Sequence, residues 1–253
     1  MTDPFLLVQL SDPHIGADWG DADPVARFAA VVDAVLALSP APGAVLVSGD
    51  LADHATDDEY LQVRELLAPL AAPVHVLPGN HDDREALRHH FDLAGAGAEP
   101  VQYAVDAGPF RLVGIDTTRP GEAPGDLDEE RLTWLDLELA ASPHAPTLIA
   151  MHHPPLTTGI RAMDDVGLPV ADRDAFGRVL ERHGHVRRIV AGHVHRAVAG
   201  EVAGCEIVVA PSIYVAARLD FYSEEITLTD EPPGFAIHTL LDGQPVSHVV
   251  RVS

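Results

Sequence analysis

Six short apolar runs, each followed by turn residues, alternate along this chain with segments of helical periodicity. Runs of this length and composition are typical of strands that are buried on both faces of a sheet. Strands that alternate with helices favour the α/β class, in which the helices pack on the faces of a parallel or mixed sheet. The order of the segments therefore predicts an α/β fold. The six predicted strands are Phe5–Leu10, Ala44–Val47, Val74–Leu77, Arg111–Ile115, Thr147–Met151 and Arg188–Ala191.

The segments between the strands carry the helical pattern. In Pro24–Leu38 the apolar residues share one face, and Ser39 with Pro40 provides a stop. Thr56 and Glu59 have the spacing of a capping box, for a helix that we expect to continue to residue 70. Further predicted helices are Asp83–Phe91, Asp128–Ala141 and Asp172–His183. Beyond residue 201 the pattern predicts strands at Glu206–Ala210, Gly234–Leu241 and Val246–Val252, and a surface loop at Ser223–Pro233.

Length and composition limit the architecture further. A chain of 253 residues with 47% hydrophobic residues is sufficient for a single α/β domain with a sizeable core. The first ten residues lack a basic segment, and their apolar run is too short for a signal peptide or a membrane span. The single cysteine, Cys205, excludes an internal disulfide and a cysteine-rich zinc site. We therefore expect a soluble, cytoplasmic protein without a membrane partner.

The charge balance restricts the chemistry and the partners. The chain has 39 acidic and 16 basic residues, for a formal net charge of −23, and every basic residue is an arginine. The absence of lysine excludes a P-loop lysine and Schiff-base catalysis. An acidic surface repels long polyanions, so a nucleic acid polymer is excluded as a partner. A small anionic substrate requires a locally positive site.

Polar clusters of Asp, Asn and His follow five of the predicted strands. Ligand sites in α/β sheets gather beyond the carboxyl ends of the strands, so we expect these side chains to meet at one edge. The clusters are Asp12 with His14, Asp50 with Asp53, Asn80 with His81 and Asp82, His152 with His153, and His193 with His195.

The donor types in these clusters indicate a metal centre. Imidazole suits zinc, iron and manganese, carboxylate suits manganese and iron, and no thiolate is present. Two cations about 3.5–4 Å apart bind phosphoryl oxygens and activate a bridging water. Two divalent ions, two aspartates and one hydroxide leave a net positive charge, which would attract a phosphodiester despite the acidic chain.

The ordered motifs resemble those of the calcineurin-like metallophosphoesterase superfamily. The resemblance spans residues 12 to 195 and consists of Asp12-Pro-His14, Gly49-Asp50-Leu-Ala-Asp53, Gly79-Asn80-His81-Asp82, His152-His153-Pro-Pro and Gly192-His193-Val-His195. Within the superfamily, the segments 79–84, 116–117, 127–135 and 151–155 are most similar to class III cyclic nucleotide phosphodiesterases and the related glycerophosphodiesterases.

The resemblance implies a fold and a ligand set. The fold is a four-layer α-β-β-α sandwich of two mixed sheets in one domain, 1–253, with residues 201–253 completing the second sheet. The loop from Ser212 to Pro233 would form a site rim or a homodimer contact. One metal would be held by Asp12, His14, Asp50 and His195. The other would be held by Asp50, Asn80, His152 and His193, so that Asp50 bridges the two.

The resemblance also implies a reaction. His81 would face the substrate and give a proton to the leaving alkoxide, with Asp53 orienting its ring. The expected function is a dinuclear phosphodiesterase that hydrolyses 3′,5′-cyclic nucleotides such as cyclic AMP through attack of a metal-bridging hydroxide. The two ions would be iron or manganese, or else zinc.

Several alternatives stay open at this point. The alternative substrate is a glycerophosphodiester or a broad set of small phosphodiesters, and a more remote alternative is a non-catalytic scaffold. The sequence does not assign His153, which we expect to support the metal ligands. It leaves Arg84 open between binding phosphate and pairing with a carboxylate, and Trp19 between packing and walling the pocket.

Overall fold

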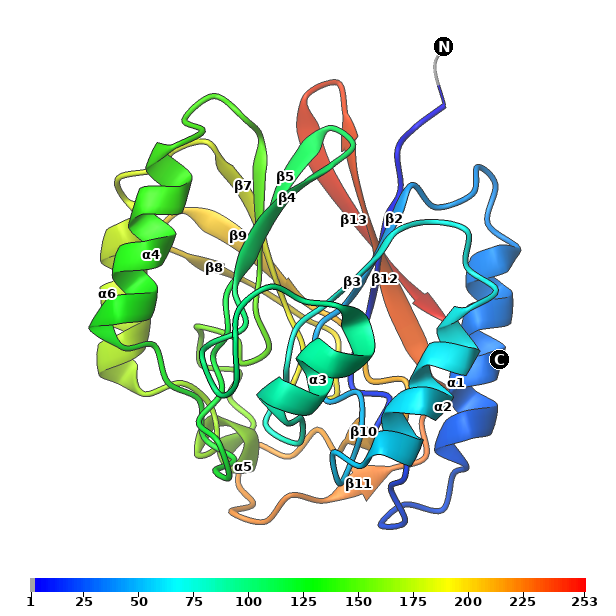
Figure 1. Ribbon diagram of the computed structural model, residues 1–253. Coiled ribbons are helices and arrows are strands. Elements are labelled where there is room, and N and C mark those ends of the chain that lie inside the picture. Colours follow the sequence, from blue (N-terminus) through cyan, green and yellow to red (C-terminus); the bar gives the residue numbers. More distant parts are fainter. Residues whose placement is uncertain (1–2) are drawn as a thin grey trace.

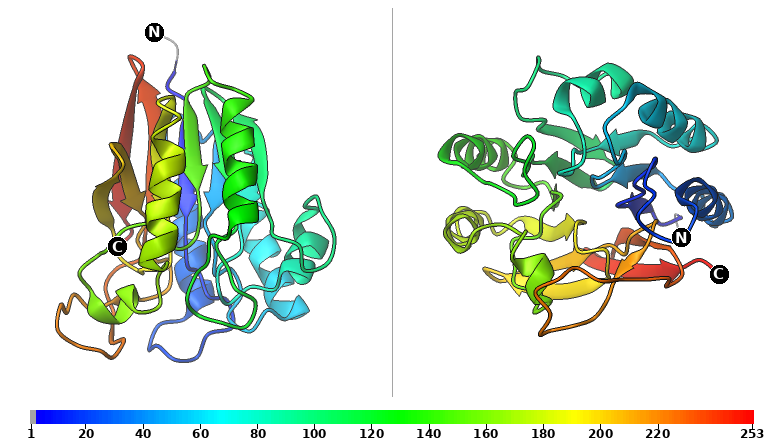
Figure 2. Two further views of the ribbon diagram at one scale, coloured as in Figure 1. Left: turned by 90° about the vertical axis from the view of Figure 1, so that its left-hand side faces the viewer. Right: turned by 90° about the horizontal axis from the view of Figure 1, so that it is seen from below.

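A computed structural model describes residues 3–253 as two β-sheets packed face to face, with helices on both outer faces (Figures 1 and 2). The first sheet has the order β13-β12-β1-β2-β3 and the second the order β4-β5-β6-β7-β9-β8. The first sheet consists of β1 (Leu7–Leu10), β2 (Ala44–Val47), β3 (Val74–Val76), β12 (Gly234–Leu241) and β13 (Gln244–Arg251). The second consists of β4 (Tyr103–Ala107), β5 (Phe110–Gly114), β6 (Thr147–Ala150), β7 (Val186–Ala191), β8 (Val198–Val202) and β9 (Cys205–Val209). The predicted four-layer α/β sandwich is confirmed.

Residues 3–253 contain six helices. They are α1 (Pro24–Leu36), α2 (Asp57–Leu67), α3 (Arg84–Phe91), α4 (Glu129–Ala140), α5 (Arg161–Asp164) and α6 (Val170–Leu180). The capping box of Thr56 and Glu59 is present at the start of α2. The short helix α5 was not predicted. No helix in residues 3–253 is long and apolar enough to cross a membrane.

The alternation of side chains along each strand builds three cores. Leu7 and Leu46 point between the sheets and pack with Leu148 of the second sheet. Their neighbours Val8 and Val45 point the other way, toward the first outer helix layer. A third core lies between the second sheet and α4 and α6. Because the central strands β1, β2 and β6 are buried on both faces, they form a well-packed framework for the loops at the strand ends.

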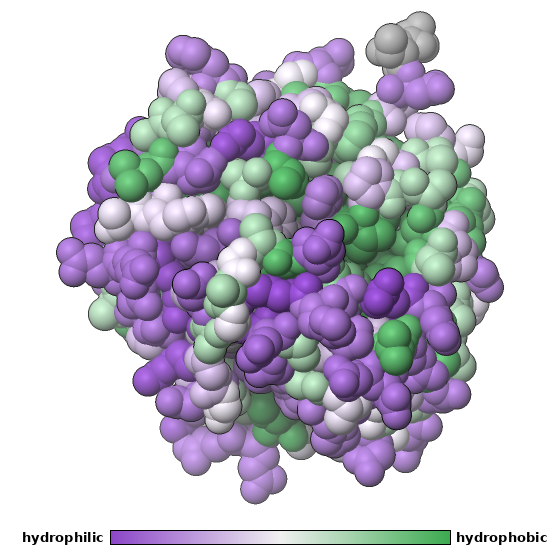
Figure 3. All heavy atoms as spheres, viewed as in Figure 1, coloured by the Kyte–Doolittle hydropathy of each residue, from purple (hydrophilic) through white to green (hydrophobic). Residues whose placement is uncertain are grey.

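Parallel pairing brings the strand ends that precede the polar clusters to one edge. β1 pairs in parallel with β2, and β2 with β3. In the second sheet β6 pairs in parallel with β7. The carboxyl ends of these strands lie at the lower end of the molecule in Figure 1. Hydrophilic side chains cover most of the face seen in Figure 3, as expected for a chain with a net charge of −23.

The C-terminal region differs from the prediction that residues 201–253 complete the second sheet. Only β9, together with the end of β8, joins that sheet, whereas β12 and β13 extend the first sheet, with β12 antiparallel to β1. The physical reason is burial. The first six residues of β12 are buried, and they cover the edge of β1, all four residues of which are buried.

The segment between β9 and β12 crosses from one sheet to the other over the carboxyl ends of the strands (Figure 1). Part of it was predicted to be a plain surface loop. It instead contains a two-stranded ladder of β10 (Ala216–Ala217) and β11 (Leu228–Thr229). We call residues 212–233 the strap. The strands β4 and β8 were also not predicted, because both are edge strands with few buried residues.

Candidate metal centre

The backbone reverses sharply where the strands meet the site. Five of the seven predicted metal ligands have φ between 45° and 68°, in the left-handed region that residues other than glycine rarely adopt. Backbone strain of this kind costs about 1–3 kcal/mol per residue and concentrates at functional sites. The five residues are Asp12, His14, Asp50, His193 and His195.

Three glycines allow the loops to touch. A Cβ atom added to Gly79 would lie 2.3 Å from the backbone nitrogen of Asp50, and one added to Gly192 would lie 2.1 Å from Ser11 Oγ. A Cβ atom at Gly49 would lie 2.3 Å from His152 Nδ1. Each glycine directly precedes a predicted ligand, so the ligands from separate strands converge only because these positions lack side chains.

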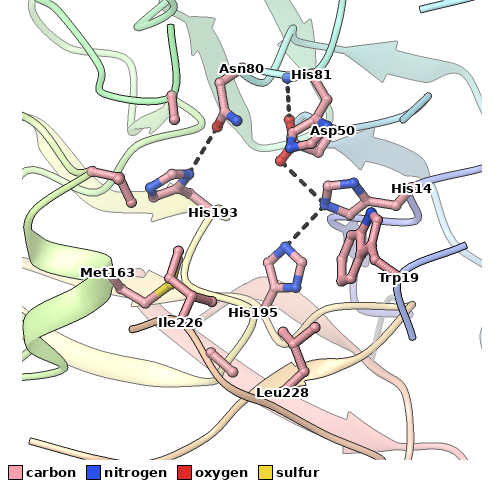
Figure 4. Close-up of a pocket in the computed structure, with 13 residues that line it drawn as sticks. His14, Trp19, Asp50, Asn80, His81, Met163, His193, His195, Ile226 and Leu228 are labelled. Carbon is pink, nitrogen blue, oxygen red and sulfur yellow. Dashed lines mark hydrogen bonds and ion pairs between the residues drawn. The ribbon is translucent and has the colours of Figure 1, made fainter. Parts of the chain in front are cut away.

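The first group of donor atoms lies on the loops that follow β1, β2 and β7. His14 Nε2 is 3.0 Å from His195 Nε2 and 3.3 Å from Asp50 Oδ2. Asp12 Oδ1 lies 3.8 Å from His195 Nε2. Donors bound about 2.0–2.2 Å from one ion are separated by roughly 3.0–3.5 Å from each other. These four side chains therefore have the spacing of one coordination sphere. Figure 4 shows three of them, His14, Asp50 and His195.

The second group lies on the other side of Asp50. His152 Nε2 is 3.3 Å from Asp50 Oδ2 and 3.2 Å from Asn80 Oδ1. His193 Nδ1 is 3.0 Å from the same Asn80 oxygen (Figure 4). Asp50 Oδ2 is thus equally distant from His14 Nε2 and His152 Nε2, one in each group. This is the position that a carboxylate shared by two cations would take.

Hydrogen bonds orient three of the imidazole rings. The Nδ1 atom of His14 lies 2.9 Å from Asp53 Oδ1. The Nδ1 atom of His152 lies 2.8 Å from the carbonyl oxygen of Ser48, and that of His195 lies 2.9 Å from the carbonyl oxygen of Val215. With the proton on Nδ1, each Nε2 presents a lone pair to the centre, as a metal-binding histidine requires.

The donor set fits a pair of cations. Asp12 is fully buried, and its Oδ2 atom has no hydrogen-bond partner among residues 3–253. Burial lowers the pKa of His14, but the carboxylates of Asp50, Asp53 and Asp12 together outweigh this effect and raise it to about 10. The same opposition raises the pKa of His152 to about 9. Without cations, the protonated rings of His14 and His152 would form ion pairs with the Asp50 carboxylate. Cations at the centre would replace those protons.

His81 stands beside the centre and is bound to Asp53. Its Nδ1 atom lies 3.1 Å from the Asp53 carbonyl oxygen and 3.3 Å from Oδ1 of the carboxylate. Burial lowers the pKa of His81, but the hydrogen bond to Asp53 and the charge of Asp50 raise it overall. The Asp53 carboxylate is closer to His14 than to His81, so it supports a predicted ligand as well as the predicted proton donor.

The three residues that the sequence left open have distinct positions. Trp19 donates its Nε1 proton to Asp53 and lines the cavity over the centre. Arg84 is 7% exposed, lies 2.8 Å from Asp116 Oδ2, and donates to the carbonyl oxygens of Thr118 and Ala98. Its guanidinium is therefore used inside the fold and does not face the centre.

His153 is adjacent to the predicted ligands but is engaged elsewhere. Its Nδ1 atom lies 2.9 Å from Thr117 Oγ1, and its Nε2 atom lies 3.0 Å from the carbonyl oxygen of Ala123. Burial lowers its pKa to about 3, which keeps the ring neutral. With both nitrogens in hydrogen bonds, His153 positions neighbouring chain segments instead of presenting a free donor.

Asp82 has a role that the sequence did not indicate. Its carboxylate accepts hydrogen bonds from the backbone nitrogens of Leu51, Ala52 and Gly79 and from the hydroxyl of Tyr60. Burial and the nearby Asp50 charge raise its pKa to about 6. Asp82 thereby joins the loop of Asp50 to the loop of Asn80. Asp82 directly follows His81 in the sequence motif, and the motif alone does not indicate that its carboxylate joins two loops.

A cavity of about 230 Å³ opens over the donor atoms. One side consists of Asp50, Asn80 and the imidazoles. The opposite side is apolar, and Ile226 and Leu228 of the strap contribute to it together with Met163 of α5 (Figure 4). Two residues of the strap therefore line the cavity.

Comparison with known proteins gives a family match. The family model of calcineurin-like phosphoesterases matches residues 5–197. A probable glycerophosphodiester phosphodiesterase of Arcobacter nitrofigilis is 31% identical, over 95% of this chain and 94% of that protein. A 3′,5′-cyclic adenosine monophosphate phosphodiesterase of Pseudomonas aeruginosa is 31% identical, over 91% of this chain and 83% of that protein.

Solved structures share the fold at low sequence identity. A dimetal phosphatase from Danio rerio superposes with a TM-score of 0.69 at 19% identity and covers 99% of this chain and 100% of that chain. A purple acid phosphatase from yellow lupin superposes with a TM-score of 0.74 at 15% identity, over 100% of this chain and 52% of that chain. These likenesses concern the arrangement of the sheets and helices.

Proposed function

Because the chain belongs to the calcineurin-like phosphoesterase family, we propose that it hydrolyses 3′,5′-cyclic nucleotides at a centre of two metal ions. The family and the phosphodiesterases among its relatives make it a metal-dependent phosphoric diester hydrolase. The assignment of a cyclic nucleotide as the substrate is the more specific part of the proposal. Cyclic AMP is the substrate that we expect.

The position of Asp50 is the observation that carries the proposal. Its Oδ2 atom lies 3.3 Å from one imidazole nitrogen in each donor group, so one carboxylate serves both sites. We assign Asp12, His14 and His195 to the first ion and Asn80, His152 and His193 to the second, with Asp50 shared. When bound there, the ions supply Lewis acidity toward a phosphoryl oxygen and lower the pKa of a water molecule.

The protein residues position the substrate and move the proton. His81 lines the cavity beside Asn80, and its Nδ1 atom is held by Asp53. Its Nε2 atom is then free to donate a proton to the oxygen of the departing alkoxide. The hydrogen bond to Asp53 and the charge of Asp50 raise the pKa of His81 against the opposing effect of burial, which favours the protonated ring. After turnover the ring takes up a proton from solvent water.

The apolar side of the cavity favours a nucleoside over a small polyol. Met163, Ile226 and Leu228 face the donor atoms across the cavity (Figure 4). Trp19, with 39% of its surface exposed, adds an aromatic ring beside them. A planar base would bury these side chains, whereas glycerol would leave them in contact with water.

A substrate panel tests the proposal. We expect metal-loaded protein to hydrolyse cyclic AMP with a higher kcat/KM than glycerophosphocholine, and to cleave bis(4-nitrophenyl) phosphate faster than 4-nitrophenyl phosphate. The variant Ile226→Asp should raise the KM for cyclic AMP about tenfold, because it places a charge on the apolar side. Leu241→Asp is the matched control, since Leu241 is similarly exposed and lies at the end of β12. A preference for the monoester, or an equal effect of both variants, would overturn the proposal.

Glycerophosphodiester hydrolysis is the second candidate function. The observation in its favour is the similarity to the Arcobacter nitrofigilis protein, which extends over nearly the whole length of both chains. The same panel separates the two candidates. A kcat/KM for glycerophosphocholine above that for cyclic AMP would establish the second candidate instead of the first.

The identity of the ions and the assembly belong to the proposal as well. We propose iron or manganese, with zinc as the alternative, because the donors are imidazoles, carboxylates and one amide. Metal analysis of protein purified without added metal measures which ions are present. A non-catalytic scaffold would hold fewer than two ions per chain.

We also propose a homodimer contact through the strap, whose side chains Phe221 and Tyr222 are 53% and 90% exposed. Light scattering measures whether the protein is a dimer in solution.

A further inference from the structure

A second recess adjoins the metal centre on the far side of His81. It has a volume of about 240 Å³ and shares Asn80 and His81 with the apolar cavity. This volume is several times the roughly 30 Å³ that one water molecule occupies. Asn80 and His81 lie opposite the apolar side chains in Figure 4. The two hollows therefore meet at the residue to which we assign proton donation.

The outer wall of the recess is a tight turn after β5. Arg119, Pro120 and Gly121 line the recess, and Gly121 has φ of +79°. Proline followed by a glycine with positive φ is the pattern of a type II turn, and an isolated bridge between Arg119 and Glu122 closes it. The turn presents the Arg119 side chain at the mouth of the recess.

Arg119 is the arginine of the recess whose side chain remains accessible. It is 44% exposed, and its ion pair with Glu122 spans 3.2 Å between side chains that are both exposed. Such a surface pair is weak and is readily exchanged for another anion. The guanidinium of Arg84, by contrast, is held by Asp116 and by two backbone carbonyl groups.

The carboxylates of the recess are already engaged. Asp82 accepts four hydrogen bonds from the surrounding loops. Asp83 caps α3 by accepting a hydrogen bond from the backbone nitrogen of Ala86. An incoming anionic group would therefore find one exposed guanidinium, while hydrogen bonds occupy Asp82 and one oxygen of Asp83.

We propose that this recess is a second substrate subsite, which holds the departing alcohol of an acyclic phosphodiester, and that Arg119 selects alcohols that carry an anionic group. The inference rests on the proposed phosphodiesterase function and extends its substrates beyond cyclic nucleotides. A cyclic nucleotide has no separate alcohol and leaves the recess empty. An acyclic diester of a nucleoside places its base against the apolar side and its second substituent beside Arg119.

The test uses two phenyl esters of adenosine 5′-phosphate. They are identical except that the departing phenol carries a 3-carboxylate in one and a 3-carboxamide in the other. We expect wild-type protein to favour the carboxylate about fivefold in kcat/KM, through a lower KM, since an exposed charge pair contributes a modest free energy. In Arg119→Gln the ratio should fall to about one, and in Arg119→Lys part of it should remain.

Arg182→Gln is the matched control, because Arg182 is 52% exposed, pairs with Asp136 and lies away from both hollows. It should retain the wild-type ratio. Calorimetric binding of both esters in the presence of chelator gives the same comparison without turnover. A wild-type ratio near one, or a ratio that persists in Arg119→Gln, overturns the subsite. Failure to hydrolyse these esters and cyclic AMP alike contradicts the phosphodiesterase function itself, and the binding ratio then still decides the subsite.

Discussion

At the scale of single residues, the site depends on which nitrogen of each imidazole is committed elsewhere. His14, His152 and His195 each direct Nδ1 to an oxygen atom of the protein, which leaves Nε2 for the centre. His153 has hydrogen bonds at both nitrogens. The hydrogen-bond partners therefore separate the imidazoles that are able to bind a cation from one that only supports them.

His81 should matter more for poor leaving groups than for good ones. We expect His81→Gln to lower kcat for cyclic AMP by roughly 10²–10⁴-fold, because the ribose alkoxide needs a proton. Hydrolysis of bis(4-nitrophenyl) phosphate should fall much less, because 4-nitrophenolate departs without one. Steady-state kinetics on both substrates measures the difference. Equal losses on the two substrates, or loss of bound metal, would contradict the assigned role.

His238 should make stability depend on pH. It is buried between Gln9 and Ser247, and burial lowers its pKa from 6.5 to about 3. The unfolded chain then binds a proton that the folded chain excludes, so this contribution is complete above pH 6.5 and is lost as the pH falls toward 3. The expected loss is about 1.4 kcal/mol per pH unit.

Denaturant unfolding of wild type and His238→Gln between pH 7 and pH 4 checks this linkage. The variant lacks the titrating group, so its free energy of unfolding should fall less steeply with decreasing pH than that of wild type. Parallel pH profiles for the two proteins would refute it.

At the scale of elements, the centre exists because loops from different strands approach within contact distance. The loops after β2 and β3 touch at Asp50 and Gly79, and the loops after β1 and β7 touch at Ser11 and Gly192. Asp82 secures the first of these contacts through three backbone hydrogen bonds. The strand register sets the position of each loop along the strand direction, and the glycines allow neighbouring loops to approach each other closely.

A methyl group at Gly79 should therefore weaken metal binding. The new Cβ in Gly79→Ala would lie 2.3 Å from a backbone atom, so the Asn80 loop must move away from Asp50. We expect metal affinity to fall by about 10–100-fold, as when a supporting contact is removed. Gly184→Ala is the control, because nothing lies within 4 Å of its added Cβ. Calorimetric titration measures both, and equal affinities would rule out this explanation.

At the scale of the whole molecule, the donors come from both sheets. Asp12 and Asp50 follow strands of the first sheet, whereas His152 and His193 follow strands of the second. Ions at the centre would therefore join the two halves of the sandwich. A ligand that binds the folded state alone stabilises it by about 4 kcal/mol at a thousand times its Kd.

Metal removal should consequently lower the unfolding temperature of the entire domain. We expect a chelator to reduce Tm by roughly 10 °C for a chain of this size. In Asp50→Asn most of the difference between metal-loaded and chelated protein should disappear. Scanning calorimetry provides the measurement, and a Tm that is insensitive to chelator in wild type would show that the ions do not connect the sheets.

Much of this architecture could be predicted from the sequence, because short buried strands and capped helices are local patterns. The strand ends of Leu10 and Val47 and the capping box at Thr56 are examples. The destination of β12 could not be predicted, because its partner β1 lies more than two hundred residues away and both sheets offered an edge. The same limit applies to Arg84 and Asp82, whose partners are set by tertiary packing.

Anomalous diffraction from metal-loaded crystals would show whether two ions share Asp50. We expect two peaks about 3.5–4 Å apart, one on each side of the Asp50 carboxylate, with His14 and His195 on one peak and His152 and His193 on the other. A single peak, or two peaks of which only one contacts Asp50, would contradict this expectation.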